Sequence, residues 1–156
     1  MTHAEKAREL FMEGYNCSQA VVGAFAEELG MEKATAMKLA SSFGAGMGRL
    51  REVCGTVTGM FLIAGLKYGY SDPKAKEEKA SHYKRIQTLA AQFREKNGTI
   101  ICRELLEKRM KKPVDTNPIP EERTEQYYKQ RPCVAVVMQA AEIMEQYINE
   151  NKKEDL

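Results

Sequence analysis

The sequence predicts an all-α protein, a single-domain bundle of six to seven helices around a buried central helix at about Val53–Leu66. Apolar residues recur at helical spacing along most of the chain, and few stretches alternate as strands do. Capping residues precede the periodic segments and glycines follow them. The chain of 156 residues fits one domain, 1–156, which is long enough to bury a core without disulfides or metals.

Three helices are expected before the first glycine-rich stretch. Thr2 can cap a first helix that ends at Gly14. Asn16 can cap a second helix, because Gln19 stands three positions later, as in a capping box. Gly30 ends that helix, and the third, "KATAMKLASSF", leads into the glycine-rich turn.

The later elements begin with the central helix. The segment "EVCGTVTGMFLIAGLKYG" is apolar on nearly every side, as expected of a helix buried inside a bundle. Asp72-Pro73 should open a long polar helix that Asn97-Gly98 closes, and a shorter helix carries "IICRELLEKRM". The prolines of "KKPVDTNPIPEE" predict a surface loop, after which Arg131-Pro132 open the last helix.

Composition and charge exclude several classes of partner. The chain is 43% hydrophobic and 29% charged, which is typical of a globular domain. Its net charge of +2 gives no reason to expect nucleic acid or a membrane surface as a partner. No secretory signal is visible, and the longest apolar stretch is about half of a membrane span. We expect a cytoplasmic protein, for which homodimerisation is plausible but not demonstrated by any sequence feature.

Four cysteines are the candidate functional residues: Cys17, Cys54, Cys102 and Cys133. Cytoplasmic cysteines are normally reduced, so catalytic, redox-sensing or metal-binding roles are favoured over structural disulfides. None belongs to a CxxC pair, so the local signal for zinc or for a thioredoxin-type dithiol is weak. The absence of CxxCH excludes covalent c-type haem attachment.

Each cysteine is expected in the first turn of a helix. Cys17 should lie at the first helical position, Cys102 near the third and Cys133 near the second, with Cys54 just after the glycine-rich turn. A helix N-terminus stabilises a thiolate and lowers its pKa. Arginines near three of the cysteines act in the same direction: Arg49, Arg51, Arg103 and Arg131. We therefore expect the four cysteines to meet in space, although buried cysteines also occur as plain core residues.

The glycines of "FGAGMGRLREVCGTVTG" are expected to shape the site. Their G-x-G-x-G spacing follows a helix, whereas a phosphate-binding turn needs a preceding strand and G-x-G-x-x-G. We expect them instead to permit positive φ and close packing beside the cysteines. The candidate site-shaping residues are Gly44, Gly46, Gly48, Gly55 and Gly59.

The order of Cys17, "FGAGMG", "CGTVTG", "ICRELL" and "PCVAVV" resembles the redox-active four-cysteine family labelled C_GCAxxG_C_C. The similarity covers nearly the whole chain. Thr56 is the departure, because alanine is expected after the Cys-Gly pair. The resemblance implies a helical domain with thiol-based or cofactor-based redox chemistry, and it implies no substrate.

Three functions remain open. The first is thiol–disulfide exchange or electron transfer, as in a thiol-dependent oxidoreductase, with Cys54 the candidate attacking thiolate and an unknown redox partner. In the second, the same four cysteines hold Zn²⁺ or an iron–sulfur cluster. The third is a non-catalytic helical binding module with buried cysteines. We rank bare thiols without a cofactor first.

Overall fold

The computed structural model describes residues 1–152 and is all-α, as predicted. Its helices are α1 (His3–Met12), α2 (Cys17–Ala26), α3 (Lys33–Ser41), α4 (Gly44–Met47), α5 (Gly55–Tyr68), α6 (Lys76–Asn97), α7 (Cys102–Met110), α8 (Glu125–Gln130) and α9 (Cys133–Glu150). The short segments α4 and α8 were not predicted, and they explain why the described residues contain more helical segments than the six to seven predicted. Within the described residues the β-structure is one isolated antiparallel bridge, Val53–Ile101.

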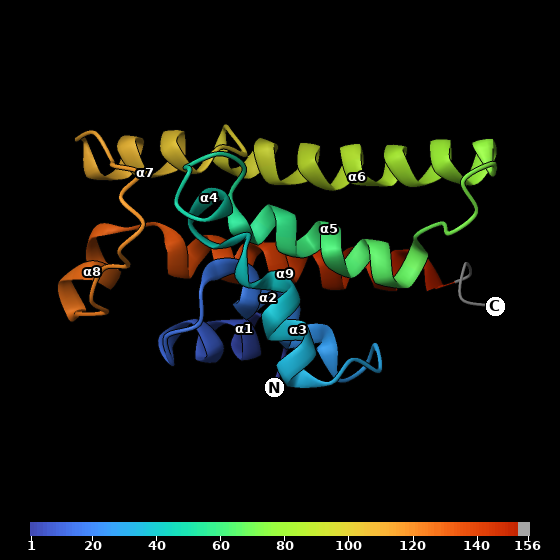
Figure 1. The fold of residues 1–156 in the computed structure, drawn as a ribbon, viewed down its shortest axis with the longest axis horizontal. Helices are drawn as coiled ribbons and strands as arrows, with labels where there is room; N and C mark the ends of the chain where they lie inside the picture. The colour runs from blue at the N-terminus through green and yellow to red at the C-terminus, as the bar shows by residue number, and fades with distance from the viewer. Residues whose placement is uncertain (153–156) are drawn as a thin grey trace.

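The helices form three rows (Figure 1). α6 runs along one side with α7 continuing its line, α5 and α9 cross the middle, and α1, α2 and α3 lie on the opposite side. α5 contacts α2, α6 and α9, so it is the central helix that the sequence predicted, beginning at Gly55.

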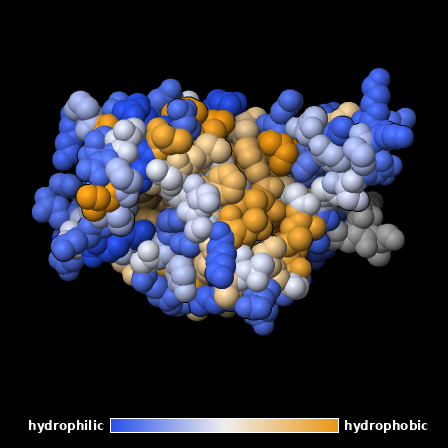
Figure 2. Space-filling model, in the orientation of Figure 1, coloured by the Kyte–Doolittle hydropathy of each residue, from blue (hydrophilic) through white to orange (hydrophobic). Residues whose placement is uncertain are grey.

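The burial of α5 is uneven along its length. Val57, Met60 and Ile63 are almost fully buried in the core, whereas Leu66 near the C-terminal end is 49% exposed. Figure 2 shows a hydrophobic area on this face of the molecule, over α5. The prediction of a helix buried on all sides therefore holds for its N-terminal part, which is the part beside the cysteines.

Local capping explains most helix boundaries. Thr2 and Asn16 cap their helices as expected, and both form capping boxes, although the box was predicted only for Asn16. Gly98 ends α6 in the left-handed conformation. The predicted start of α6 at Asp72-Pro73 is wrong, because Asp72 instead accepts a hydrogen bond from the backbone N of Lys74 (2.9 Å) in a turn. The helix therefore begins three residues after Pro73, at Lys76.

No helix in residues 1–152 has the length and apolar character that a membrane crossing requires.

On α6, His82 is only 8% exposed, and its Nδ1 lies 3.2 Å from Nη1 of Arg85. Burial, together with the nearby Arg85 charge, lowers the pKa of His82.

Candidate functional site: a cavity lined by four cysteines

All four cysteines lie at helix starts. Cys17, Cys102 and Cys133 are the first residues of α2, α7 and α9, and Cys54 is the N-cap of α5. The expected positions of Cys102 and Cys133 were therefore one or two residues too far along their helices. In this structure all four are free thiols.

The four cysteines line one cavity of about 270 Å³. They reach it from four helices that are separated in the sequence. Figure 1 shows why they meet: α4, α7 and α8 gather at one end of the bundle, where α5 and α9 also begin. The structure thus brings together every cysteine that the sequence singled out.

A short antiparallel contact joins Cys54 to Cys102. The backbone N of Cys54 donates to the carbonyl oxygen of Ile100 (2.7 Å), and the backbone N of Cys102 donates to that of Glu52 (2.6 Å). These bonds flank the Val53–Ile101 bridge. The N-termini of α5 and α7 are consequently fixed beside each other by the backbone alone.

Cys17 is held by its own helix cap and by a glycine opposite. The side chain of Asn16 caps α2 and also donates from Nδ2 to the carbonyl oxygen of Ser41 (3.1 Å). Across the cavity, a Cβ added at Gly55 would lie 2.4 Å from Sγ of Cys17. The Cys17 sulfur therefore rests against the first turn of α5, where only glycine leaves room for it.

The turn before Cys54 has a left-handed backbone. Residues in this stretch with φ between 56° and 72° are Ala45, Gly46, Met47, Gly48, Arg49 and Arg51. α4 is therefore a left-handed turn and not an ordinary helical segment. Four of these residues carry a Cβ, and such conformations are maintained only where the surrounding structure enforces them.

The candidate site-shaping glycines have two different functions. Gly46 and Gly48 have positive φ, and a Cβ at Gly46 would also lie 2.6 Å from Cβ of Cys102. Gly44, Gly55 and Gly59 instead permit close approach. A Cβ at Gly44 would overlap the Asn16 side chain, and one at Gly59 would lie 3.1 Å from Val21 on α2.

Burial opposes ionisation of three of the thiols, contrary to the expectation of lowered pKa values. Burial, together with the charge of a thiolate at Cys17, raises the pKa of Cys54 to about 12. The pKa of Cys102 and of Cys133 is raised by the same two causes in the same order. Desolvation and mutual repulsion between thiolates thus exceed the opposing effect of the nearby arginines at Cys102 and Cys133.

Two polar neighbours act in the opposite direction. The Thr56 hydroxyl oxygen lies 3.1 Å from Sγ of Cys54, and this hydrogen bond partly lowers the Cys54 pKa. Nη1 of Arg51 lies 3.9 Å from Sγ of Cys102 and has the same effect there. Thr56 is the residue at which alanine was expected, so this hydroxyl is a feature of this chain.

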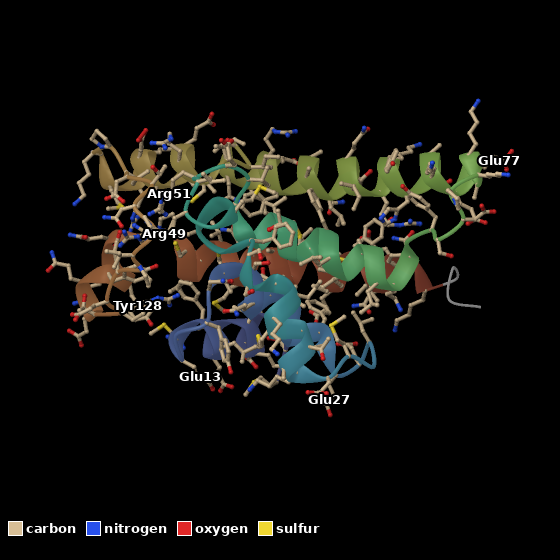
Figure 3. All side chains as sticks on the ribbon, in the orientation of Figure 1. Glu13, Glu27, Arg49, Arg51, Glu77 and Tyr128 are labelled. Carbon is tan, nitrogen blue, oxygen red and sulfur yellow. The ribbon has the colours of Figure 1, made fainter. Side chains whose placement is uncertain are left out.

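The loop that the sequence placed on the surface covers one side of the cavity. We call residues 113–124 the strap. Pro118, Pro120 and Glu121 of the strap line the cavity. Arginine side chains hold it in place: Nε of Arg51 donates to the carbonyl oxygen of Asp115 (3.0 Å), and Arg49 donates to that of Asn117. Figure 3 shows Arg49 and Arg51 between α7 and α8, at the cysteine end of the bundle.

Two more arginines complete the wall. Arg123, which the sequence analysis missed, donates to the carbonyl oxygens of Phe11 and Tyr15 (both 2.9 Å). Arg131 donates to Glu121, and its guanidinium lies 4.2 Å from the ring centroid of Tyr127. No local pattern marks Arg123, because it contacts the site only after the strap folds back onto α1.

The described residues do not form a ready-made metal site. Within residues 1–152, no group of three or more His, Cys, Asp or Glu side chains is arranged to hold a metal ion. The cysteines share a cavity, but their sulfur atoms are not gathered into one coordination sphere.

Comparison with known proteins gives the family. No curated protein and no solved structure matches the chain. The family described as "Putative redox-active protein (C_GCAxxG_C_C)" matches residues 15–147, a range that contains all four cysteines and the glycine-rich turn. The chain therefore belongs to the C_GCAxxG_C_C family.

Proposed function

We propose that this protein is a thiol–disulfide oxidoreductase in which Cys17 is the attacking cysteine. The observation that carries the proposal is the shared cavity: four free thiols line it, and the charge of Cys17 acts on each of the other three. Cys17 thus interacts with each of the other three thiols, as Cys133 also does, and access distinguishes the two buried thiols from Cys17.

Access favours Cys17 over Cys54, and burial disfavours the Cys54 thiolate. Cys54 is 6% exposed and Cys102 is 8% exposed, whereas Cys17 is half-buried at the first position of α2. A pKa of about 12 leaves very little Cys54 thiolate at neutral pH, and the thiolate is the nucleophile. The sequence-based choice of Cys54 as the attacking thiolate is therefore replaced.

The proposed reaction has two steps. The Cys17 thiolate attacks one sulfur of a substrate disulfide, forming a mixed disulfide and releasing one substrate thiolate, which takes up a proton. A second cysteine of the cavity then attacks Cys17 in the mixed disulfide, which releases the second substrate thiol. The substrate is reduced to two thiols, and the protein is oxidised to one internal disulfide.

Cys102 is the best-placed partner for the second step. The Arg51 guanidinium beside its sulfur partly offsets the cost of ionising Cys102 in a buried position. Arg131 likewise lowers the pKa of Cys133, but it pairs with Glu121, whereas Arg51 contacts the Cys102 sulfur directly. Arg51 acts here as a positioning residue that works through Cys102.

Thiol titration tests the proposal. The fully reduced protein is treated with a slight excess of a small disulfide, then denatured and assayed for free thiols, with peptide mapping by mass. We expect loss of two thiols per chain, a mass about 2 Da lower, and full recovery with dithiothreitol. Cys17→Ser should abolish the loss, whereas Cys133→Ser should retain it. Four titratable thiols after prolonged exposure of the folded protein would contradict the proposal.

The metal alternative is tested on the same preparation. Anaerobically purified protein should show no visible absorption band and no stoichiometric iron or zinc. A brown protein with about two or four iron atoms per chain would overturn the thiol mechanism in favour of an iron–sulfur cluster. The thiol proposal also keeps the cytoplasm as the expected location, because free thiols persist in a reducing compartment.

A further inference from the structure

We infer that the cavity selects small disulfides that carry negative charge. This inference rests on the proposed thiol–disulfide function and adds the class of substrate. It is carried by the charged residues that line the cavity. Four of them are arginines and one, Glu121, is acidic; the arginines are Arg49, Arg51, Arg123 and Arg131.

Two of these arginines have no carboxylate partner within salt-bridge distance in the described part of the chain. Arg49 and Arg131 pair with acidic side chains, including Glu121. Arg51 and Arg123 donate instead to backbone carbonyl oxygens, which carry no net charge. The Asp115 carboxylate on the strap interacts with Arg51 from beyond salt-bridge distance and pairs with Arg49, so it offsets part of this charge. Four arginines against Glu121 and Asp115 still leave the cavity wall with an excess of positive charge.

The burial of Arg51 makes this excess important. Its residue is 4% exposed, its Nε is bound to the Asp115 carbonyl oxygen, and its Nη1 faces Sγ of Cys102. A buried cation is costly unless an anion accompanies it. An anionic group that enters the cavity would supply that partner, and charge interactions are stronger there than in water.

The helix starts act in the same direction. α2, α5, α7 and α9 have 10, 14, 9 and 18 residues, and each begins at a cysteine of the cavity or directly after one. The N-terminus of a helix carries about half a positive charge. These partial charges add to the arginines around the same sulfur atoms.

The size and the remaining walls favour a small molecule. The cavity of about 270 Å³ has the volume of about nine waters at ~30 Å³ each. Its apolar wall includes Phe11, Leu105, Leu106 and Val136, which suits the methylene groups beside a disulfide. A disulfide with short carboxylate arms satisfies both the volume and the charge.

The reaction is the one given above with this substrate. The Cys17 thiolate attacks one sulfur of the dicarboxylate disulfide, and one carboxylate-bearing thiol leaves. Attack by the second cysteine on Cys17 releases the other. Two substrate thiols and one protein disulfide are formed, and the two electrons come from the two cysteines.

A charge series tests the inference. The probes are dithiodiglycolate, 2-hydroxyethyl disulfide and cystamine, whose two-carbon arms end in a carboxylate, a hydroxyl and an ammonium group. The second-order rate constant for thiol loss is measured for the reduced protein and divided by that of dithiothreitol with the same disulfide. This division removes the intrinsic reactivity of each probe.

We expect the normalised rate to fall from dithiodiglycolate to cystamine by about tenfold or more, and the difference to shrink with added salt. Arg51→Gln should reduce the ratio of the normalised rate for dithiodiglycolate to that for cystamine several-fold. Arg8→Gln, which removes an exposed charge outside the cavity, should leave this ratio unchanged. Circular dichroism confirms that each variant is folded. If Arg51→Gln does not fold, Arg51→Lys and the salt dependence of the unmodified protein provide the test.

The outcomes separate the two proposals. Equal normalised rates for the three probes would overturn the charge selection and leave the thiol–disulfide function standing. Absence of reaction with every probe would overturn the function itself. A rate that is highest for cystamine would also refute the selection of anions.

Discussion

Replacing Gly55 by alanine tests whether the Cys17 sulfur rests against α5. Gly55 is the first residue of α5, directly after Cys54. The new Cβ would lie 2.4 Å from Sγ of Cys17 and 2.9 Å from the carbonyl oxygen of Phe43. Ordinary contacts to a Cβ are longer than about 3.4 Å. The sulfur can rotate away, but the backbone oxygen cannot, so the start of α5 must move.

The size of the effect follows from the two contacts. Adding a group to a well-packed interior costs about 1–3 kcal/mol, and a clash with backbone belongs at the upper end. Alanine at this position gains little helix propensity, because the first helical residue lies outside the helix interior. We expect the free energy of unfolding to fall by about 2 kcal/mol.

Gly65 provides the matched control in the same helix. A Cβ there would meet nothing within 4 Å, and no positive φ opposes it. Gly65→Ala should therefore raise the free energy of unfolding by about 0.5–1 kcal/mol, the usual gain in helix propensity. The two alanine variants should differ by roughly 3 kcal/mol.

Urea denaturation of the reduced proteins, monitored by circular dichroism, measures the free energy of unfolding of both variants. The rate of Cys17 alkylation provides a local readout, and it should change in Gly55→Ala only. If Gly55→Ala were as stable as Gly65→Ala, with Cys17 reacting at an unchanged rate, the close packing of Cys17 on α5 would be refuted.

Four further substitutions test the surroundings of the site and the core. The lowered pKa of His82 means that the fold favours its neutral form, so the free energy of unfolding should fall as pH drops through about 6.5. His82→Gln should reduce this dependence in urea titrations at several pH values; an unchanged slope would contradict it. Asn16→Ala removes a helix cap and should cost about 1–2 kcal/mol, whereas unchanged stability would exclude a capping role. Ala45→Gly relieves a left-handed conformation and should add about 0.5–1 kcal/mol; a loss would show that its methyl group is needed. Arg123→Ala removes two hydrogen bonds to backbone carbonyl oxygens and a longer one to Tyr128, and should cost about 3 kcal/mol, with faster alkylation of the cavity thiols if the strap loosens; unchanged stability would contradict it.

The helices and the cysteine positions were predictable because their signals are local. The capping boxes at Thr2 and Asn16 and the glycine at Gly98 mark boundaries that the structure reproduces. The expected helix starts placed every cysteine within a residue or two of its observed position. The start of α6 was predicted wrongly because an aspartate followed by a proline occurs both in turns and at helix N-termini.

The charge environment of the site was not predictable from nearby residues. Arg51 lies near Cys54 in the sequence, yet its guanidinium faces Cys102. Arg123 reaches the cavity from a segment with no periodic signal. The raised pKa of Cys54 depends on burial by several helices at once, which a local reading of helix starts cannot supply.

The backbone contact between the starts of α5 and α7 explains why Cys54 and Cys102 are neighbours in space although they are far apart in the sequence. The chain between them runs out along α5 and returns along α6 (Figure 1). The number of residues between the two cysteines therefore reflects the length of a helical hairpin and is not the spacing of a sequence motif. The connection between α5 and α6 lies at the end of the bundle opposite α7. Whole helical turns could be added to or removed from both arms together while the two sulfur atoms keep their relation. Sequence spacing is therefore a poor search criterion for sites of this design, and the residues flanking each cysteine are a better one.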